Sequence, residues 1–319
     1  MTAADKELSH MPVTATHTSL VFEFPQIAED AGLSVTFHRT LRVPDDETTY
    51  GLPPSLGAFS LSNEREGAGI LMPMWQSEAC WLSFSTSRPF DSMPFLVKVG
   101  AGSVNAVTGG RWTPEPDFEA EDYFEVPEQP WLDGFCTGHN VVRQFVAMPL
   151  GGGYTVEEQL VDAPATGGIH LSVYPLKKSV WEQRSRGDVD HGMVFNCCGV
   201  PGDMGLGAGG SITQSIATPV EPHDNWDLTA GLSTFVRTVN TQQWQAITGE
   251  PPHTSPLTIE EYRAYGFPWF ERYDDTLARQ GSESLAAVST VRQVGAKTGH
   301  DPLPDNGGFD PPKPIVVGP

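Results

Sequence analysis

The chain has 319 residues, of which 39% are apolar and 10% aromatic, so it is long and apolar enough to bury a sizeable core. Its formal net charge is −21, because only 19 Lys and Arg residues stand against 40 Asp and Glu. A nucleic-acid interface needs clustered cations, and an anionic membrane surface attracts them, so this charge argues against both partners. The 33 glycines and 28 prolines favour many turns over long helices.

Targeting and membrane segments are not visible in the sequence. The first ten residues, MTAADKELSH, lack the apolar stretch of a signal peptide, and no run approaches the roughly 18 apolar residues of a membrane-spanning helix. The four cysteines are too few for a disulfide framework. These features favour a cytoplasmic location.

Alternating apolar and polar residues predict β-strands over most of the chain before residue 240. The expected strands cover, in chain order, residues 20–24, 33–43, 70–84, 95–99, 103–107, 141–148, 169–174, 211–216 and 232–239. The acidic, proline-containing segment 112–130 is expected to be a surface excursion. The six glycines of residues 199–210 predict a long turn or loop.

The C-terminal part changes to a helical pattern. Residues 241–248 form a short helix candidate, and Thr258 is a suitable N-cap because Glu261 then stands at the capping-box position. Two further helices are expected, in residues 268–280 and 282–293. Strands followed by grouped helices indicate an α+β, β-rich fold with antiparallel sheets, either a sandwich or barrel-like, and argue against a parallel βαβ sheet.

The same patterns divide the chain into three parts. We expect residues 1–16 to be a flexible arm, residues 17–295 a single β-rich domain and residues 296–319 a Pro-rich extended tail. A subdivision of the domain near residues 160–200 is left open.

Motifs for cofactors and metals are weak. Residues 205–210 match G-x-G-x-x-G by letter, but residues 211–217 read as a strand, whereas a pyrophosphate site requires a following helix. Residues Cys136, His139, Cys197 and Cys198 lack the ligand spacing of known zinc motifs, and the sequence leaves metal binding by them open. We therefore expect no cofactor and no bound metal.

Charged residues inside the expected strands are the strongest functional signal. Glu78, Lys98 and Arg143 all stand among apolar neighbours. A buried charge has to be paired, hydrated or bound to a ligand, because burying it alone is costly. The strands of Glu78 and Lys98 are expected to pair or lie close in one sheet. If the three side chains meet in a cavity, Arg143 can hold a carboxylate or phosphate and Glu78 can act as a general base. A structural ion pair is the alternative.

Polar and aromatic residues near these positions complete a candidate ligand-binding set: Gln76, Trp81, Gln144, Trp131 and Asp133. Trp131 and Trp269 each follow a proline in a turn, a position typical of an aromatic side chain that anchors the turn on the core. We therefore expect both tryptophans to anchor the structure, with ligand binding as the alternative for Trp131.

Several segments resemble a family of bacterial proteins that is frequent in actinobacteria. They include QSEACWL at residues 76–82, VPEQPWLDG at 126–134 and RQFVAMPLG at 143–151, and they continue from Ile247 to Phe270. The resemblance spans about residues 17–295. It implies no reaction, cofactor or partner, because none is assigned to such proteins.

Two functions follow from these observations. The lack of a recognisable catalytic motif favours a soluble β-rich protein that assembles with itself or binds a partner. The alternative is an enzyme or a small-molecule-binding protein with a polar cavity built from Glu78, Lys98 and Arg143. A homo-oligomer and a small-molecule ligand are thus both open as partners, and convergence of the three side chains would favour the second function.

Overall fold

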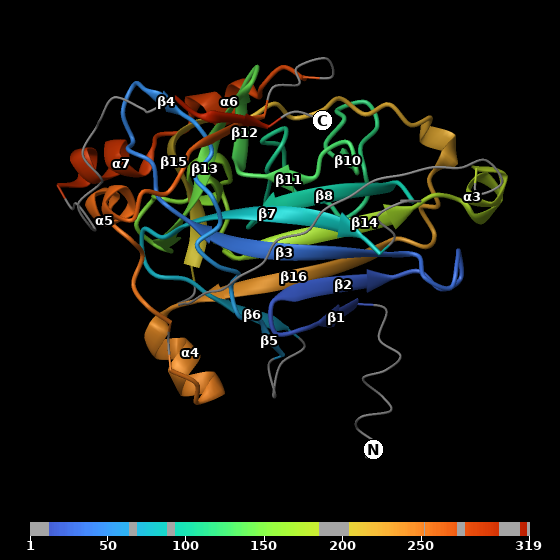
Figure 1. Ribbon diagram of the computed structural model, residues 1–319, viewed down its shortest axis with the longest axis horizontal. Helices are drawn as coiled ribbons and strands as arrows, with labels where there is room; N and C mark the ends of the chain where they lie inside the picture. Colours follow the sequence, from blue (N-terminus) through green and yellow to red (C-terminus); the bar gives the residue numbers. More distant parts are fainter. Residues whose placement is uncertain are drawn as a thin grey trace.

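Two large open β-sheets, one two-stranded sheet and a few short helices make up the described part of the chain (Figure 1). The computed structural model describes residues 13–63, 69–87, 93–184, 204–251, 253–272, 278–299 and 313–317. Within these ranges the expected β-rich α+β class is confirmed, and each of the expected strands overlaps an observed one. The two large sheets are open rather than barrel-like, because in the described ranges the first and last strands of each sheet do not pair with each other.

The larger sheet has nine strands in the described residues, in the order β1-β2-β3-β7-β13-β15-β4, with β11 added on β7 and β12 on β13. Its pairings are antiparallel except for β15 with β4. The strands are β1 (Val13–Ala15), β2 (Ser19–Glu23), β3 (Gly32–Thr40), β4 (Thr49–Tyr50), β7 (Ala79–Thr86), β11 (Trp131–Leu132), β12 (Gly134–Gly138), β13 (Val141–Pro149) and β15 (Met204–Thr213).

The second sheet has seven strands in the described residues, in the order β10-β8-β14-β16-β6-β5, with β9 added on β8. Only β16 and β6 pair in parallel. The strands are β5 (Ser62–Asn63), β6 (Ile70–Pro73), β8 (Phe95–Ala101), β9 (Val104–Asn105), β10 (Phe124–Val126), β14 (Ile169–Pro175) and β16 (Leu232–Val239). The segment 112–130, expected as a surface excursion, therefore contributes β10 to this sheet.

The apolar faces of the two sheets pack against each other. Phe84 of β7 meets Phe124 of β10 with ring centroids 5.1 Å apart, and Phe24 meets Phe95 of β8 at 5.5 Å. All four rings belong to one buried cluster that extends over both sheets. Full burial of such a side chain contributes about 1.5–3 kcal/mol, so this shared face is the main source of stability.

The helices are short and lie around the sheets: α2 (Val156–Leu160), α3 (Lys178–Arg184), α4 (Thr241–Thr248), α5 (Ile259–Ala264), α6 (Glu283–Ala287) and α7 (Val291–Thr298). Figure 1 shows α5 and α7 gathered at one end of the sheets and α3 at the opposite end. The helix over residues 241–248 is confirmed, and so is the capping box of Thr258 and Glu261 that starts α5. Helices α2 and α3 were not expected.

The two other expected helices differ from the structure. In the range 268–280 the described residues form β17 (Phe270–Arg272), which pairs in parallel with β18 (Ile315–Val317). The range 282–293 divides into α6 and the start of α7, because Ser282 and Thr290 each cap a separate helix. The expected arm and tail also contribute strands, β1 and β18, and their residues 1–12 and 300–312 lie outside the described ranges.

Of the glycine-rich segment 199–210, expected to be a loop, residues 204–210 belong to strand β15, which is buried along most of its length, and residues 199–203 lie outside the described ranges. A Cβ atom at Gly209 would lie 2.5 Å from Cγ2 of Val146, and one at Gly210 would overlap the carbonyl group of Pro44. Glycine is needed here because the neighbouring chain approaches the strand too closely for a side chain. The expectation was wrong because glycine predicts a turn only where the backbone is free to bend.

We expect Gly210→Ala to destabilise the protein by about 1–3 kcal/mol, because the added methyl group has to displace the backbone of Pro44. Gly138→Ala is the matched control in a neighbouring strand, since its added Cβ would lie 3.6 Å from Val141, an ordinary contact. Urea unfolding of both variants measures the difference. Equal stability of the two variants would contradict the close packing of β15.

Candidate functional site

Glu78 lies just before β7 and is 1% exposed. Its Oε1 atom accepts a hydrogen bond from Arg39 Nε at 2.6 Å, and its Oε2 atom accepts one from the Trp75 backbone N–H at 2.9 Å. Nε2 of His253 lies 3.5 Å from Oε1. Burial raises the pKa of Glu78 to about 7, although the charge of Arg39 opposes the shift. The carboxyl group thus ties β3 to the segment that contains His253.

Lys98 belongs to β8 in the other sheet, so the expectation that its strand lies in one sheet with that of Glu78 is wrong. Each strand pairs with others: β8 lies between β10 and β14, whereas β7 lies between β3 and β13. Lys98 Nζ is fully buried and lies 2.6 Å from Oδ2 of Asp122. It also donates to the Glu115 carbonyl and lies 5.3 Å from the Trp112 ring centroid.

Arg143 of β13 donates from Nη1 to the Val288 carbonyl at 2.7 Å. It shares no partner with Glu78 or Lys98 among the contacts of the described residues. The structure therefore does not bring the three candidate catalytic side chains together. Glu78 and Lys98 each form a local ion pair, which is the structural alternative.

Two of the expected ligand-binding residues, Gln76 and Gln144, lie apart from the other three. Gln76 is half-buried in the turn before β7. Gln144 is fully buried, and its side chain donates to the Leu41 carbonyl at 2.8 Å and accepts from the Val43 N–H at 3.0 Å. Both ends of this amide are therefore used to hold the chain that follows β3.

The other expected ligand-binding residues, Trp81, Trp131 and Asp133, meet around strand β7. Leu82 and Phe84 point into the core between the sheets. Because side chains alternate along a strand, Trp81 and Ser83 point to the opposite face, away from the second sheet. Cross-strand pairing places Trp131 beside Ser83, and Trp81 and Asp133 flank the pair Leu82–Leu132.

A chain of hydrogen bonds crosses this outer face of β7. His38 of β3 stands opposite Trp81, and their rings stack with centroids 3.9 Å apart. Nε2 of His38 lies 2.7 Å from Ser83 Oγ, and Nδ1 lies 3.0 Å from Ser55 Oγ. Burial lowers the pKa of His38 to about 4, so the imidazole is neutral at physiological pH. A neutral imidazole between two hydroxyl groups can accept a proton from one of them.

Asp133 follows β11, next to these residues, and its buried carboxyl group pairs with no cation among the described residues. Its Oδ2 atom accepts a hydrogen bond from Gln214 Nε2 at 2.7 Å, and its backbone N–H donates to Gln214 Oε1 at 2.9 Å. Burial raises the pKa of the Asp133 carboxyl to about 7, and a hydrogen bond from the Trp131 side chain opposes the shift. Trp131 is half-buried. Its side chain packs against the core and also forms a hydrogen bond with the Asp133 carboxyl group.

The sequence predicted only some of the residues that meet on the outer face of β7. His38, Ser55 and Ser83 were not candidates, because they are separated by 17 and 45 residues along the chain and share no motif. The available signal was a histidine on the polar face of a strongly alternating strand, which by itself predicts only a surface or structural imidazole.

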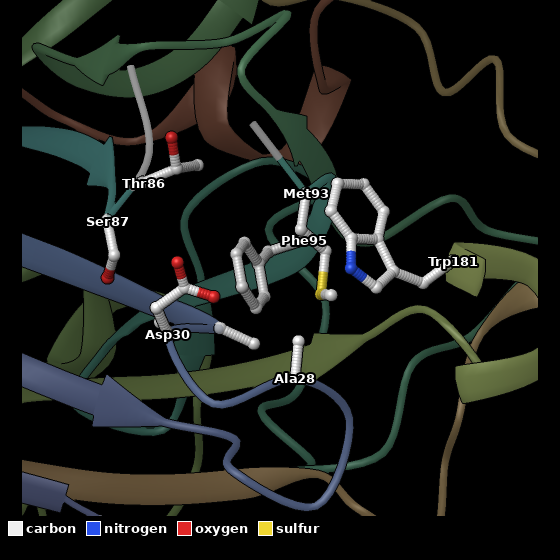
Figure 2. A pocket seen from close by; sticks show the side chains of 9 residues that line it. Ala28, Asp30, Thr86, Ser87, Met93, Phe95 and Trp181 are labelled. Atoms are coloured by element: carbon white, nitrogen blue, oxygen red, sulfur yellow. The ribbon is translucent and has the colours of Figure 1, made fainter. Parts of the chain in front are cut away.

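A small cavity lies elsewhere, near the loop between β2 and β3. It has a volume of about 10 Å³, room for roughly one water molecule. Figure 2 shows Asp30, Thr86 and Ser87 on one side of it and Met93, Phe95 and Trp181 on the other. Larger surface depressions are lined by residues 150–165 and 223–229, among others, and include none of the candidate residues above.

The described residues contain neither a cluster of metal ligands nor a helix that could span a membrane. No group of three or more His, Cys, Asp or Glu side chains there is arranged to hold a metal ion. Cys80 and Cys136 are buried free thiols, and Cys197 and Cys198 lie outside the described residues. In those same ranges, none of the helices combines the length and the apolar character needed to cross a membrane.

We expect Lys98→Met to destabilise the protein by about 3–5 kcal/mol, because it leaves the carboxylate of Asp122 buried without its cation. The control is Arg184→Met, which removes the solvent-exposed cation of the pair Arg184–Glu221 and should cost no more than about 1 kcal/mol, because Glu221 also accepts a hydrogen bond from Asn225. Denaturant unfolding measures both values. A Lys98→Met variant as stable as the control would exclude a structural role for this pair.

Asp133→Asn tests the raised pKa of the buried carboxyl group. The carboxyl has a pKa of about 7 in the folded protein and of about 3.9 in an unfolded chain, so it stabilises the fold below about pH 4 and this contribution is lost as the pH rises through about 7. Since asparagine stays neutral, the variant should gain on the order of 2 kcal/mol relative to wild type between about pH 5 and about pH 8.

Urea unfolding across this pH range measures the effect. Asp162→Asn, at an exposed position, controls for the change in net charge and should follow the wild-type pH dependence. A stability difference between Asp133→Asn and wild type that does not change with pH would contradict the raised pKa.

Comparison with known proteins finds no matching family model, curated protein or solved structure. The resemblance to an actinobacterial family therefore stays a prediction. The function of this chain has to be argued from its own geometry.

Proposed function

We propose that this protein is a self-assembling subunit and that two copies join through the free edge of strand β18. The observation that carries the proposal is an apolar edge strand: Ile315 and Val316 of β18 are 54% and 58% exposed. Within the described residues β18 pairs with β17 alone. An exposed apolar edge strand is a template for pairing with another chain.

The sheet to which β18 belongs is too small to be stable by itself. It has two strands among the described residues, and their pairing includes the hydrogen bond from Ile315 N–H to the carbonyl of Trp269, the residue before β17, at 2.7 Å. Three or more strands, or packing on another element, are normally needed for a stable sheet. In the proposed dimer, the second copy supplies the additional strands.

Exposed aromatic side chains continue the apolar surface along the chain that leads into β17. Tyr265 is 66% and Phe267 38% exposed, and their rings contact each other at 5.6 Å. The ring of Phe267 also contacts that of buried Tyr262, which packs on Trp269. Aromatic residues of this kind supply much of the binding energy at interfaces between subunits.

A second copy is the partner that fits this edge best. The same edge strand on two copies can pair antiparallel about a two-fold axis, which gives a closed dimer with a four-stranded sheet and leaves neither β18 edge free. The net charge of −21 on each copy opposes this contact. Because salt screens the repulsion, the dimer should be stronger at higher ionic strength.

Val316→Lys tests the proposal. A lysine on the free edge blocks strand pairing, so the variant should be monomeric at concentrations where the wild type is dimeric, with a dissociation constant at least about tenfold weaker. Sedimentation velocity over a concentration series, at low and high salt, measures the mass of each species.

The matched control is Val220→Lys, since Val220 is 55% exposed and lies outside β18. It should dimerise as the wild type does, and circular dichroism should show that both variants are folded. A wild type that stays monomeric at every concentration and salt, or a dimer that Val316→Lys leaves intact, would overturn the proposal.

A further inference from the structure

The outer face of β7 holds a serine that is bonded to a histidine, independently of the edge strand that we propose for assembly. Ser83 Oγ lies 2.7 Å from His38 Nε2, and His38 Nδ1 lies 3.0 Å from Ser55 Oγ. A nucleophile next to a base, with a third group that orients the base, is the arrangement that activates a serine hydroxyl. Ser83 is half-buried, whereas His38 is fully buried behind it.

The hydrogen bonds around His38 are compatible with the tautomer that this chemistry requires. Ser55 Oγ already accepts a hydrogen bond from the Gly57 N–H at 3.2 Å. Its remaining lone pair can accept a hydrogen bond from Nδ1–H of His38, and in that tautomer the lone pair on Nε2 is directed at Ser83. The stacked ring of Trp81, inclined by only 10° to the imidazole, keeps the base in this plane.

The tryptophan stacked on His38 carries a donor without an acceptor among the described residues. The indole Nε1–H of Trp81 is buried and makes no hydrogen bond within the described residues. Leaving such a donor unsatisfied costs free energy, and an acceptor oxygen bound at the site would relieve that cost. In acyl transfer, a donor of this kind stabilises the negative oxygen that forms when a hydroxyl attacks a carbonyl group.

We propose that Ser83 is the nucleophile of an acyl-transfer site that takes esters of carboxylic acids, with His38 as its general base and Ser55 as a positioning residue. Ser83 Oγ forms a bond to the acyl carbon while its proton passes to Nε2 of His38. The ester C–O bond then breaks, and the alcohol leaves with that proton. Water hydrolyses the acyl-serine and releases the carboxylic acid, with the same imidazole carrying the proton.

A fluorophosphonate probe tests the nucleophile directly. Attack by Ser83 Oγ on phosphorus expels fluoride and leaves a stable phosphonyl-serine, while the proton goes to His38 and then to water. We expect one label per chain, located on Ser83 by peptide mass spectrometry. Hydrolysis of a short-chain nitrophenyl ester, measured with the same full-length protein, should be lost on labelling.

Variants distinguish this site from chance reactivity. Ser85→Ala is the matched control, because Ser85 lies two residues on along the same face of β7, and its cross-strand partner is Ser34, further along β3 from His38 than Thr36, the partner of Ser83. The Ser85→Ala variant should be labelled by the probe at the wild-type rate, whereas the Ser83→Ala variant should not be labelled. His38→Asn should slow labelling at least about 100-fold, as expected when general-base assistance is removed.

Ser55→Ala tests the positioning role. It should slow labelling less than His38→Asn does and lower kcat for the ester while KM changes little, because Ser55 does not touch the substrate. Circular dichroism and the melting temperature show which variants remain folded. An unlabelled wild type, a label on another serine, or equal rates in His38→Asn and wild type would overturn the proposal.

Discussion

Burial of the apolar faces of the two sheets against each other is the constraint on which the rest of the structure depends. The faces meet through contacts such as that between Phe84 of β7 and Phe124 of β10. Since a strand alternates its side chains between two faces, placing Leu82 and Phe84 in this core sends Trp81 and Ser83 to the other side. The polar chain of His38, Ser83 and Ser55 is therefore a consequence of how β7 packs.

The buried charges follow from the same low-polarity core. Arg39 and Glu78 meet at 2.6 Å in the larger sheet, and Lys98 and Asp122 meet at 2.6 Å beside the smaller one. Each charge is neutralised by a neighbour within its own sheet or in a segment that packs on it, because an isolated buried charge would cost several kcal/mol. Local pairing leaves no need for the three candidate side chains to converge, and they do not.

The glycines of β15 are explained by the close approach of neighbouring segments to the backbone of this strand. In β15, Gly209 lies against Val146 and Gly210 against Pro44, with no room for side chains. The strand therefore joins β13 to β4 and is covered on both faces. By contrast, β18 pairs with β17 alone among the described residues and exposes the side chains of Ile315 and Val316.

The sequence by itself determined the class of the fold and many local features. The alternation of residues 33–43 and 141–148 predicted strands that form, and the capping box of Thr258 and Glu261 predicted the start of α5, because both patterns depend on neighbours along the chain. Only the tertiary structure decided which strands share a sheet, that the glycine-rich segment 204–213 is a strand, and that Ser83 meets His38 across 45 residues. These features depend on strand pairing and on the space that distant segments leave free, and neither is encoded in local periodicity.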